Sequence, residues 1–244
     1  MATYQEQRER EYQNKLVKRF QDELGYQYLG NWQYAKGEAV NCLGKQNSPI
    51  LDDEVRKFLK DQKKDDGKTP RYTECQIEDV LFQLKSKARL GNAKMNDLMQ
   101  CNTDLYDTLM MGIKSQPDPK SNHEDVMLFD FEDFTNNNFA IAEEVSYIDP
   151  LLGKNKRPDI VVYVNGIALA VIELKRSLVN YEEGIKQHLS NERDFIPSFF
   201  TIKEVFFRIS PSPFSQRELH ILTKPSLLRK EGCNRPPVLR TATL

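Results

Sequence analysis

Two acidic side chains and a lysine stand at the ends of two apolar runs that follow each other closely. Asp159 lies near the start of the first run, and Glu173 and Lys175 lie at the end of the second. Residues two apart in a strand project to the same face, so Glu173 and Lys175 share one. Two carboxylates that come close repel each other unless one takes up a proton or both bind a cation. Carboxylate oxygens with water suit Mg²⁺, with Mn²⁺ as the alternative, and they do not suit zinc.

The two apolar runs predict a β-hairpin that carries these charged residues. They are rich in β-branched residues and meet at Asn165-Gly166, which is the strongest short-range hairpin signal. A metal bound there would polarise a phosphate and activate water, while a neighbouring cation would stabilise the developing charge, as phosphodiester hydrolysis requires. The competing interpretation is a structural hairpin with a solvated aspartate and a surface Glu-x-Lys, a spacing that also arises by chance.

The register of the hairpin decides whether the two carboxylates share a face. A strict two-residue turn would pair Val164 with Ile167, and Glu173 would then face away from Asp159. A three-residue loop would pair Tyr163 with Ile167 and place Asp159 diagonal to Glu173 on one face. We predict the three-residue loop, because it gathers the charged groups.

The residues around the charged groups resemble a known nuclease motif. Pro158-Asp159, an apolar run and Glu173-Leu174-Lys175 match the PD-(D/E)xK pattern. The sequence from Arg157 to Lys175 resembles the nuclease domain at the N-terminus of the R (restriction) subunit of type I restriction–modification enzymes. The resemblance implies that Asp159, Glu173 and the main-chain carbonyl of Leu174 hold Mg²⁺, and that Lys175 orients or activates the attacking water.

The resemblance also implies two supporting residues. The family opens with a helix whose glutamate helps to complete the metal site, and Glu11 is the match, with Glu9 as its competitor and a solvated surface acid as the alternative. In a related recombination-nuclease family, a glutamine is followed four residues later by a tyrosine. Gln187 fits the first position as a supporting catalytic residue, but Asn191 stands where the tyrosine would be.

The fold implied by the resemblance is α/β, with a restriction-endonuclease-like mixed central sheet, helices on both of its faces and an N-terminal helical insert. The endonuclease domain would span residues 1–210, with the insert at about 50–112 and the catalytic core at about 124–210. Residues 211–244 hold five prolines and are expected to be an irregular tail of a truncated product. No Walker A motif is present, so ATP would serve only motor domains absent from these residues.

The implied partners are double-stranded DNA and the methylation and specificity subunits of the restriction complex. The alternative function is a non-catalytic module for DNA binding or subunit assembly. From Leu151 onward the chain has 15 basic and 9 acidic residues, a net charge of +6, which suits contact with the DNA backbone. The short basic loop Lys154–Arg157 is a candidate phosphate contact, with a solvated turn as its alternative.

Other segments are predicted from hydrophobic spacing and capping signals. Thr73 and Gln76 fit a capping box at the start of a helix. Further helices are predicted at 4–24, 51–64, 93–111 and about 180–193, and strands at 126–131, 139–148 and 204–209. Residues 26–45 are interpreted as a loop or ribbon, and Glu143 and Glu144 as acids on a strand surface.

The cysteines and the lack of long apolar runs indicate the cellular compartment of the protein. The four cysteines, Cys42, Cys75, Cys101 and Cys233, are scattered and form no Cys-x-x-Cys pair. They are interpreted as reduced core thiols of a cytoplasmic protein. No run approaches 18 apolar residues, so no contact with a membrane is expected.

Overall fold

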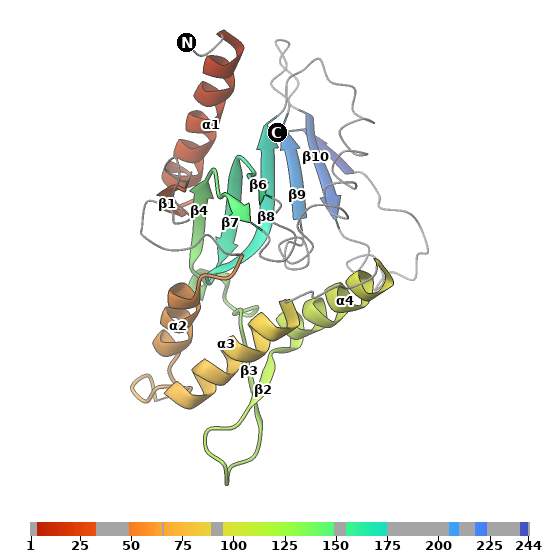
Figure 1. Ribbon diagram of the computed structural model, residues 1–244. Coiled ribbons are helices and arrows are strands. Elements are labelled where there is room, and N and C mark those ends of the chain that lie inside the picture. Colours follow the sequence, from red (N-terminus) through yellow and green to blue (C-terminus); the bar gives the residue numbers. More distant parts are fainter. Residues whose placement is uncertain are drawn as a thin grey trace.

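The predicted hairpin lies in the middle of a seven-stranded sheet (Figure 1). The computed structural model describes residues 4–32, 49–64, 66–88, 95–148, 155–174, 205–209, 218–223 and 240–243. In spatial order the strands are β1 (Gln27–Asn31), β4 (Phe139–Glu143), β7 (Ile160–Val164), β8 (Ile167–Leu174), β9 (Val205–Ile209), β10 (Glu218–Thr223) and β11 (Arg240–Thr243). β1 runs parallel to β4 and β8 parallel to β9, whereas the other neighbours are antiparallel. The prediction of a mixed sheet is therefore confirmed.

Helix α1 (Tyr4–Asp22) covers one face of the central strands. Its apolar residues Leu16, Val17 and Phe20 follow helical spacing and pack on that face. The sheet supplies Ile141, Ile160, Val162, Ala170, Ile172 and Leu174 to this contact. Fully burying one such aliphatic side chain contributes about 1.5–3 kcal/mol, so the contact fixes α1 against the sheet.

The opposite face of the same strands carries a second apolar cluster. It contains Val161, Tyr163, Ala168 and Val171 of the hairpin, together with Trp32. Burial raises the pKa of the Tyr163 phenol above its ordinary value, so this ring stays neutral. The predicted helix at about 180–193 lies outside the described residues.

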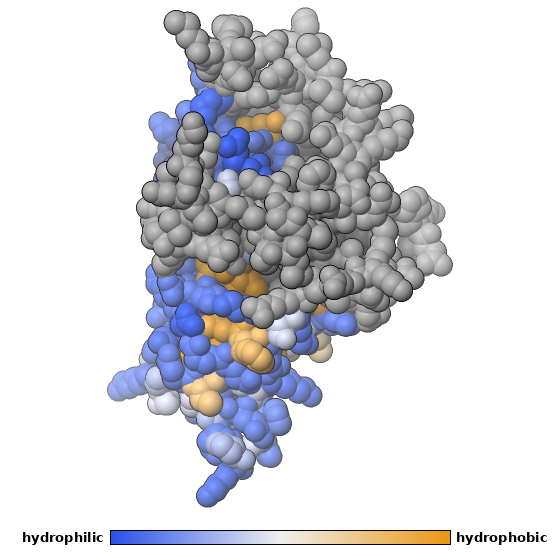
Figure 2. Space-filling model, in the orientation of Figure 1, coloured by the Kyte–Doolittle hydropathy of each residue, from blue (hydrophilic) through white to orange (hydrophobic). Residues whose placement is uncertain are grey.

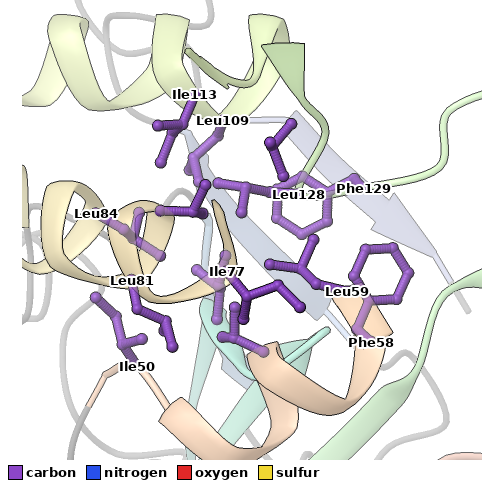
Figure 3. Close-up of a cluster of buried hydrophobic side chains, with 14 of the residues drawn as sticks. Ile50, Phe58, Leu59, Ile77, Leu81, Leu84, Leu109, Ile113, Leu128 and Phe129 are labelled. Carbon is purple, nitrogen blue, oxygen red and sulfur yellow. The ribbon is translucent and has the colours of Figure 1, made fainter. Parts of the chain in front are cut away.

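Three helices form a lobe beside the turn of the hairpin (Figure 1). The N-terminal part of α1 lies at the other end of the sheet. They are α2 (Asp52–Asp61), α3 (Glu74–Ala88) and α4 (Met95–Met111), which confirms the predicted helices of the insert. Figure 3 shows Leu59, Ile77 and Leu128 meeting in the centre of its buried core. The face of this lobe seen in Figure 2 is mostly hydrophilic, with a small apolar area.

Short elements complete the described chain. The strands β2 (Ile113–Ser115) and β3 (Glu124–Val126) pair with each other, as do β5 (Tyr147–Ile148) and β6 (Asn155–Lys156). A 3₁₀ turn, η1, spans Phe134–Asn136. None of the described helices has the length and apolar content needed to cross a membrane.

The predicted capping box at the start of α3 is confirmed. The Gln76 main-chain N–H donates to Thr73 Oγ1 at 3.3 Å, and the Thr73 main-chain N–H donates to Gln76 Oε1 at 2.9 Å. We expect Thr73→Ala to lower the free energy of unfolding by about 1 kcal/mol, because one N-terminal amide of α3 loses its acceptor. Urea denaturation followed by circular dichroism measures the change, and a loss below about 0.3 kcal/mol would contradict it.

Several predictions about individual segments are wrong. Residues 26–45 were expected to be a loop or ribbon leading away from the first helix, but β1 within them forms an edge of the central sheet. The expected single strand at 139–148 is divided between β4 and β5, which belong to different sheets, because Glu144 between them has a positive φ of 53°. The expected core thiol of Cys75 is exposed.

The expected irregular tail at 211–244 contains two strands of the central sheet. β10 pairs with β9, and β11 pairs with β10. The prolines at 211, 213, 225, 236 and 237 lie between these strands and not within them, so they do not interrupt the hydrogen-bonded ladders.

Candidate active site

The turn of the hairpin is a strict two-residue turn, so the predicted three-residue loop is wrong. Val164 pairs with Ile167, and Asn165 and Gly166 have positive φ values of 49° and 82°. Positive φ at both central residues is typical of a type I′ turn, whose twist matches that of the flanking strands. The Asn165 side chain fixes this geometry, because its amide donates to Leu128 O at 2.9 Å and its Oδ1 accepts from the Asn138 N–H at 2.7 Å.

A β-bulge in β8 then corrects the register. Tyr163 pairs with Ala168, but Val162 pairs with Ala170, so Leu169 is an extra residue on its strand. Leu169 packs against the core of the helical lobe, which gives the bulge a buried apolar contact.

The bulge brings the two acidic residues to one face of the hairpin. Beyond it, Ile160 pairs with Ile172, and continuing this register by one residue past the start of β7 would set Asp159 opposite Glu173. Directly opposed residues of an antiparallel pair project to the same side, with Cβ atoms about 4.5–5.5 Å apart. The shared face was predicted, but a bulge and not a longer turn produces it.

Asp159 is held at both its main chain and its carboxylate. The Leu174 N–H donates to Asp159 Oδ2 at 2.5 Å. The Asp159 carbonyl accepts the Glu144 N–H at 3.0 Å and the Gln13 side-chain amide at 3.1 Å. Three separate donors therefore fix the side chain and the main chain of Asp159.

Glu173 is the second acidic residue on this face of the hairpin. It is buried, since the residue is 5% exposed. The carboxylates of Asp159 and Glu173 and the main-chain carbonyl of Leu174 are hard oxygen donors, so the chemistry of this donor set fits a Mg²⁺ ion. Among the residues that the structure describes, no group of three or more His, Cys, Asp or Glu side chains forms a metal cluster.

A group of polar residues on the α1 side of the sheet was missed from the sequence. Glu143 is 3% exposed, accepts a hydrogen bond from the Tyr28 hydroxyl and lies 3.3 Å from Arg10 Nη1. Glu144 is paired with Arg157, whose Nε lies 2.8 Å from Glu144 Oε2. Both acids are therefore partnered and partly or fully buried, and the interpretation as solvated surface acids is wrong. The sequence around Glu143 and Glu144 does not predict this pairing, because most of the side chains that contact them come from distant parts of the chain.

The remaining predicted site residues, Glu11, Lys175 and Gln187, stay predictions. Glu11 is exposed on α1, while its neighbours Arg10 and Gln13 face the sheet. Lys175 and Gln187 lie outside the described residues. The strand β9 brings Arg208 into register with Glu173, a basic residue that the sequence reading did not single out.

Comparison with known proteins shows the family of this chain. The "Putative type I restriction enzyme MjaIXP endonuclease subunit" of Methanocaldococcus jannaschii is 32% identical to the chain over 108 residues. That alignment covers 41% of this chain and 10% of the relative, so the chain matches about a tenth of the relative's length. The family model described as "Type I restriction enzyme R protein N terminus" matches residues 6–210, and the chain therefore belongs to that family.

Proposed function

We propose that this chain is a Mg²⁺-dependent endonuclease that hydrolyses DNA phosphodiester bonds as the nuclease part of a type I restriction R subunit. The single observation that supports it most is the placement of Asp159 opposite Glu173, with the Leu174 N–H donated to Asp159. Membership of the R-subunit family supports a nuclease role in restriction. In this proposal the sheet is the core of a restriction-endonuclease-like fold.

The roles of the residues follow from their chemistry. The carboxylates of Asp159 and Glu173 and the carbonyl of Leu174 would hold the ion, which would polarise the scissile phosphate and lower the pKa of a bound water. Lys175 follows β8 directly and would orient the attacking water or stabilise developing charge. The burial of Glu173 lowers the local dielectric, which strengthens the attraction between the acidic pair and a cation.

The partners in this proposal are double-stranded DNA and the methylation and specificity subunits. No Walker A motif occurs in these 244 residues, so ATP use is assigned to other parts of the R subunit. The competing function is a non-catalytic DNA-binding or assembly module. It would bind DNA without any dependence of strand cleavage on Asp159, Glu173 or Lys175.

Nicking of supercoiled plasmid tests the proposal. We expect the 244-residue chain to convert plasmid to open circles with Mg²⁺, EDTA to stop the reaction, and Lys175→Ala to slow it by about a hundredfold. Lys120→Ala is the control, because Lys120 lies in an exposed turn outside the hairpin. Cleavage that resists EDTA, or a Lys175→Ala rate equal to the wild-type rate, would overturn the assignment.

A further inference from the structure

Glu144 links three parts of the chain next to the candidate active site. It follows β4 and has a positive φ of 53°, which turns its side chain out of the strand alternation. Its carboxylate meets Arg157 Nε at 2.8 Å, Gln13 Nε2 at 3.3 Å and Arg10 Nη1 at 3.8 Å. Its own N–H donates to the Asp159 carbonyl. One residue therefore joins α1, the segment before β7 and the main chain of Asp159.

Gln13 is the buried member of this group. The residue is 4% exposed, and its Nε2 donates both to Glu144 Oε1 and to the Asp159 carbonyl at 3.1 Å. Because the Glu144 N–H occupies the same carbonyl, the hydrogen-bonding capacity of the Asp159 oxygen is filled. The main chain of Asp159 is therefore fixed from α1 and from β4 together.

This restraint acts on the direction of the Asp159 carboxylate. Aspartate has one methylene between its main chain and its carboxylate, so rotation of the peptide at Asp159 displaces the carboxylate directly. The Leu174 N–H fixes one carboxylate oxygen, and Gln13 with Glu144 fixes the main chain from the other side. The direction of the carboxylate is thus restrained before any ligand binds.

We propose that Gln13 is a positioning residue for the metal site, acting through the main chain of Asp159, an inference that rests on the proposed function. It does not touch the ion. It keeps the Asp159 carboxylate aligned with Glu173. The Glu144 carboxylate accepts a hydrogen bond from the Gln13 amide and so orients it, and the ion pairs with Arg157 and Arg10 hold that carboxylate in place. Partners of this kind around metal ligands are worth about 10–100-fold in metal affinity.

Calorimetric titration with Mn²⁺ in the absence of DNA measures the effect without relying on activity. We expect Gln13→Met, which keeps the side-chain length and removes the donor, to weaken Mn²⁺ binding about tenfold. We expect the Mg²⁺ concentration for half-maximal nicking to rise by a similar factor, with a smaller change in the rate at saturating Mg²⁺. A role confined to stability would leave both metal constants unchanged.

The chain offers a closely matched control in Gln83. Its Nε2 also donates to one carboxylate, Asp79 Oδ2 at 2.9 Å, and to one main-chain carbonyl, Lys114 O at 3.1 Å, but it lies in the helical lobe. Gln83→Met is expected to leave Mn²⁺ affinity unchanged. Arg157→Gln is a second variant that avoids the buried core, since the guanidinium is 46% exposed. It removes the nearest cation from Glu144, and we expect it to weaken Mn²⁺ binding severalfold.

The outcomes separate this inference from the proposed function. Wild-type Mn²⁺ affinity in Gln13→Met and in Arg157→Gln, with binding lost in Asp159→Ala, would overturn the role of Gln13 and leave the nuclease standing. A wild-type chain that binds no Mn²⁺ would overturn both. Weaker binding in Gln13→Met and Arg157→Gln, with Gln83→Met unchanged, supports the role of Gln13.

Discussion

Asp159→Asn is expected to lower the rate of Mg²⁺-dependent nicking by about a thousandfold while leaving the fold intact. The asparagine Oδ1 can still accept the Leu174 N–H, so the local hydrogen bond survives. The substitution removes the negative charge of Asp159, which is one of the two acidic groups of the proposed metal site. Charge stabilisation by a metal contributes several kcal/mol to such reactions, and each 1.36 kcal/mol is a factor of about ten in rate.

Asp118→Asn is the matched control for this change. Asp118 also accepts a main-chain N–H, from Lys120 at 2.8 Å, but it stands in an exposed turn of the β2–β3 connection. We expect wild-type nicking from this variant and near-wild-type unfolding of Asp159→Asn by circular dichroism. If Asp159→Asn cut plasmid within threefold of the wild-type rate, the two-carboxylate site would be rejected.

Much of the framework was accessible to local reasoning. The Asn165-Gly166 turn between β-branched runs predicted the hairpin, and helical spacing predicted α1 to α4. The Thr73 to Gln76 capping box was also local, since both partners lie within one helical turn. These features depend on interactions between residues that are close in the sequence, so their residue types alone reveal them.

The register of the active face was not accessible in the same way. A two-residue turn by itself would have turned Glu173 away from Asp159, and the bulge at Leu169 reverses that result. Nothing in the local residue pattern distinguishes Leu169 from its neighbours. Its packing against the helical lobe is a long-range contact, which requires the three-dimensional structure.

The same limit applies to the residues that hold Asp159. Gln13 is 146 residues from Asp159 and 131 from Glu144, and its amide contacts both. On α1 the family resemblance implies a glutamate, Glu11, whereas the helix turns Arg10 and Gln13 towards the sheet. The five prolines after residue 210 predict an irregular tail, but they separate β10 and β11 from their neighbours and do not interrupt them.

Gly166→Ala is expected to lower the free energy of unfolding by about 4 kcal/mol, because positive φ and overpacking each contribute at this position. Gly166 has φ +82°, and a Cβ there would lie 2.8 Å from Leu51 O, 2.8 Å from Glu54 Cβ and 2.9 Å from Val55 N. Two of these atoms belong to the main chain at the start of α2, so no side-chain rotation can relieve the clash. Urea denaturation measures the loss.

Gly67→Ala separates the two causes of that loss. Gly67 also has a positive φ of 65°, but a Cβ there would meet nothing within 4 Å, so we expect a loss of about 1 kcal/mol from strain alone. Equal losses in the two variants would show that the tip of the hairpin does not depend on its close approach to α2.

The wild-type contact at Gly166 also bears on the distant active face. The Leu51 N–H donates to Gly166 O at 2.8 Å, and the Ala168 N–H donates to Pro49 O at 2.9 Å, so the segment entering α2 pairs with the start of β8 on either side of Ile167. This pairing lies between the turn and the bulge at Leu169, whereas Asp159 lies on the far side of the bulge. In Gly166→Ala molecules that remain folded, we therefore expect the bulge to preserve the pairing of Ile160 with Ile172. Their Mn²⁺ affinity should then match that of the wild type, and a tenfold loss would show that the turn helps to set the register of the active face.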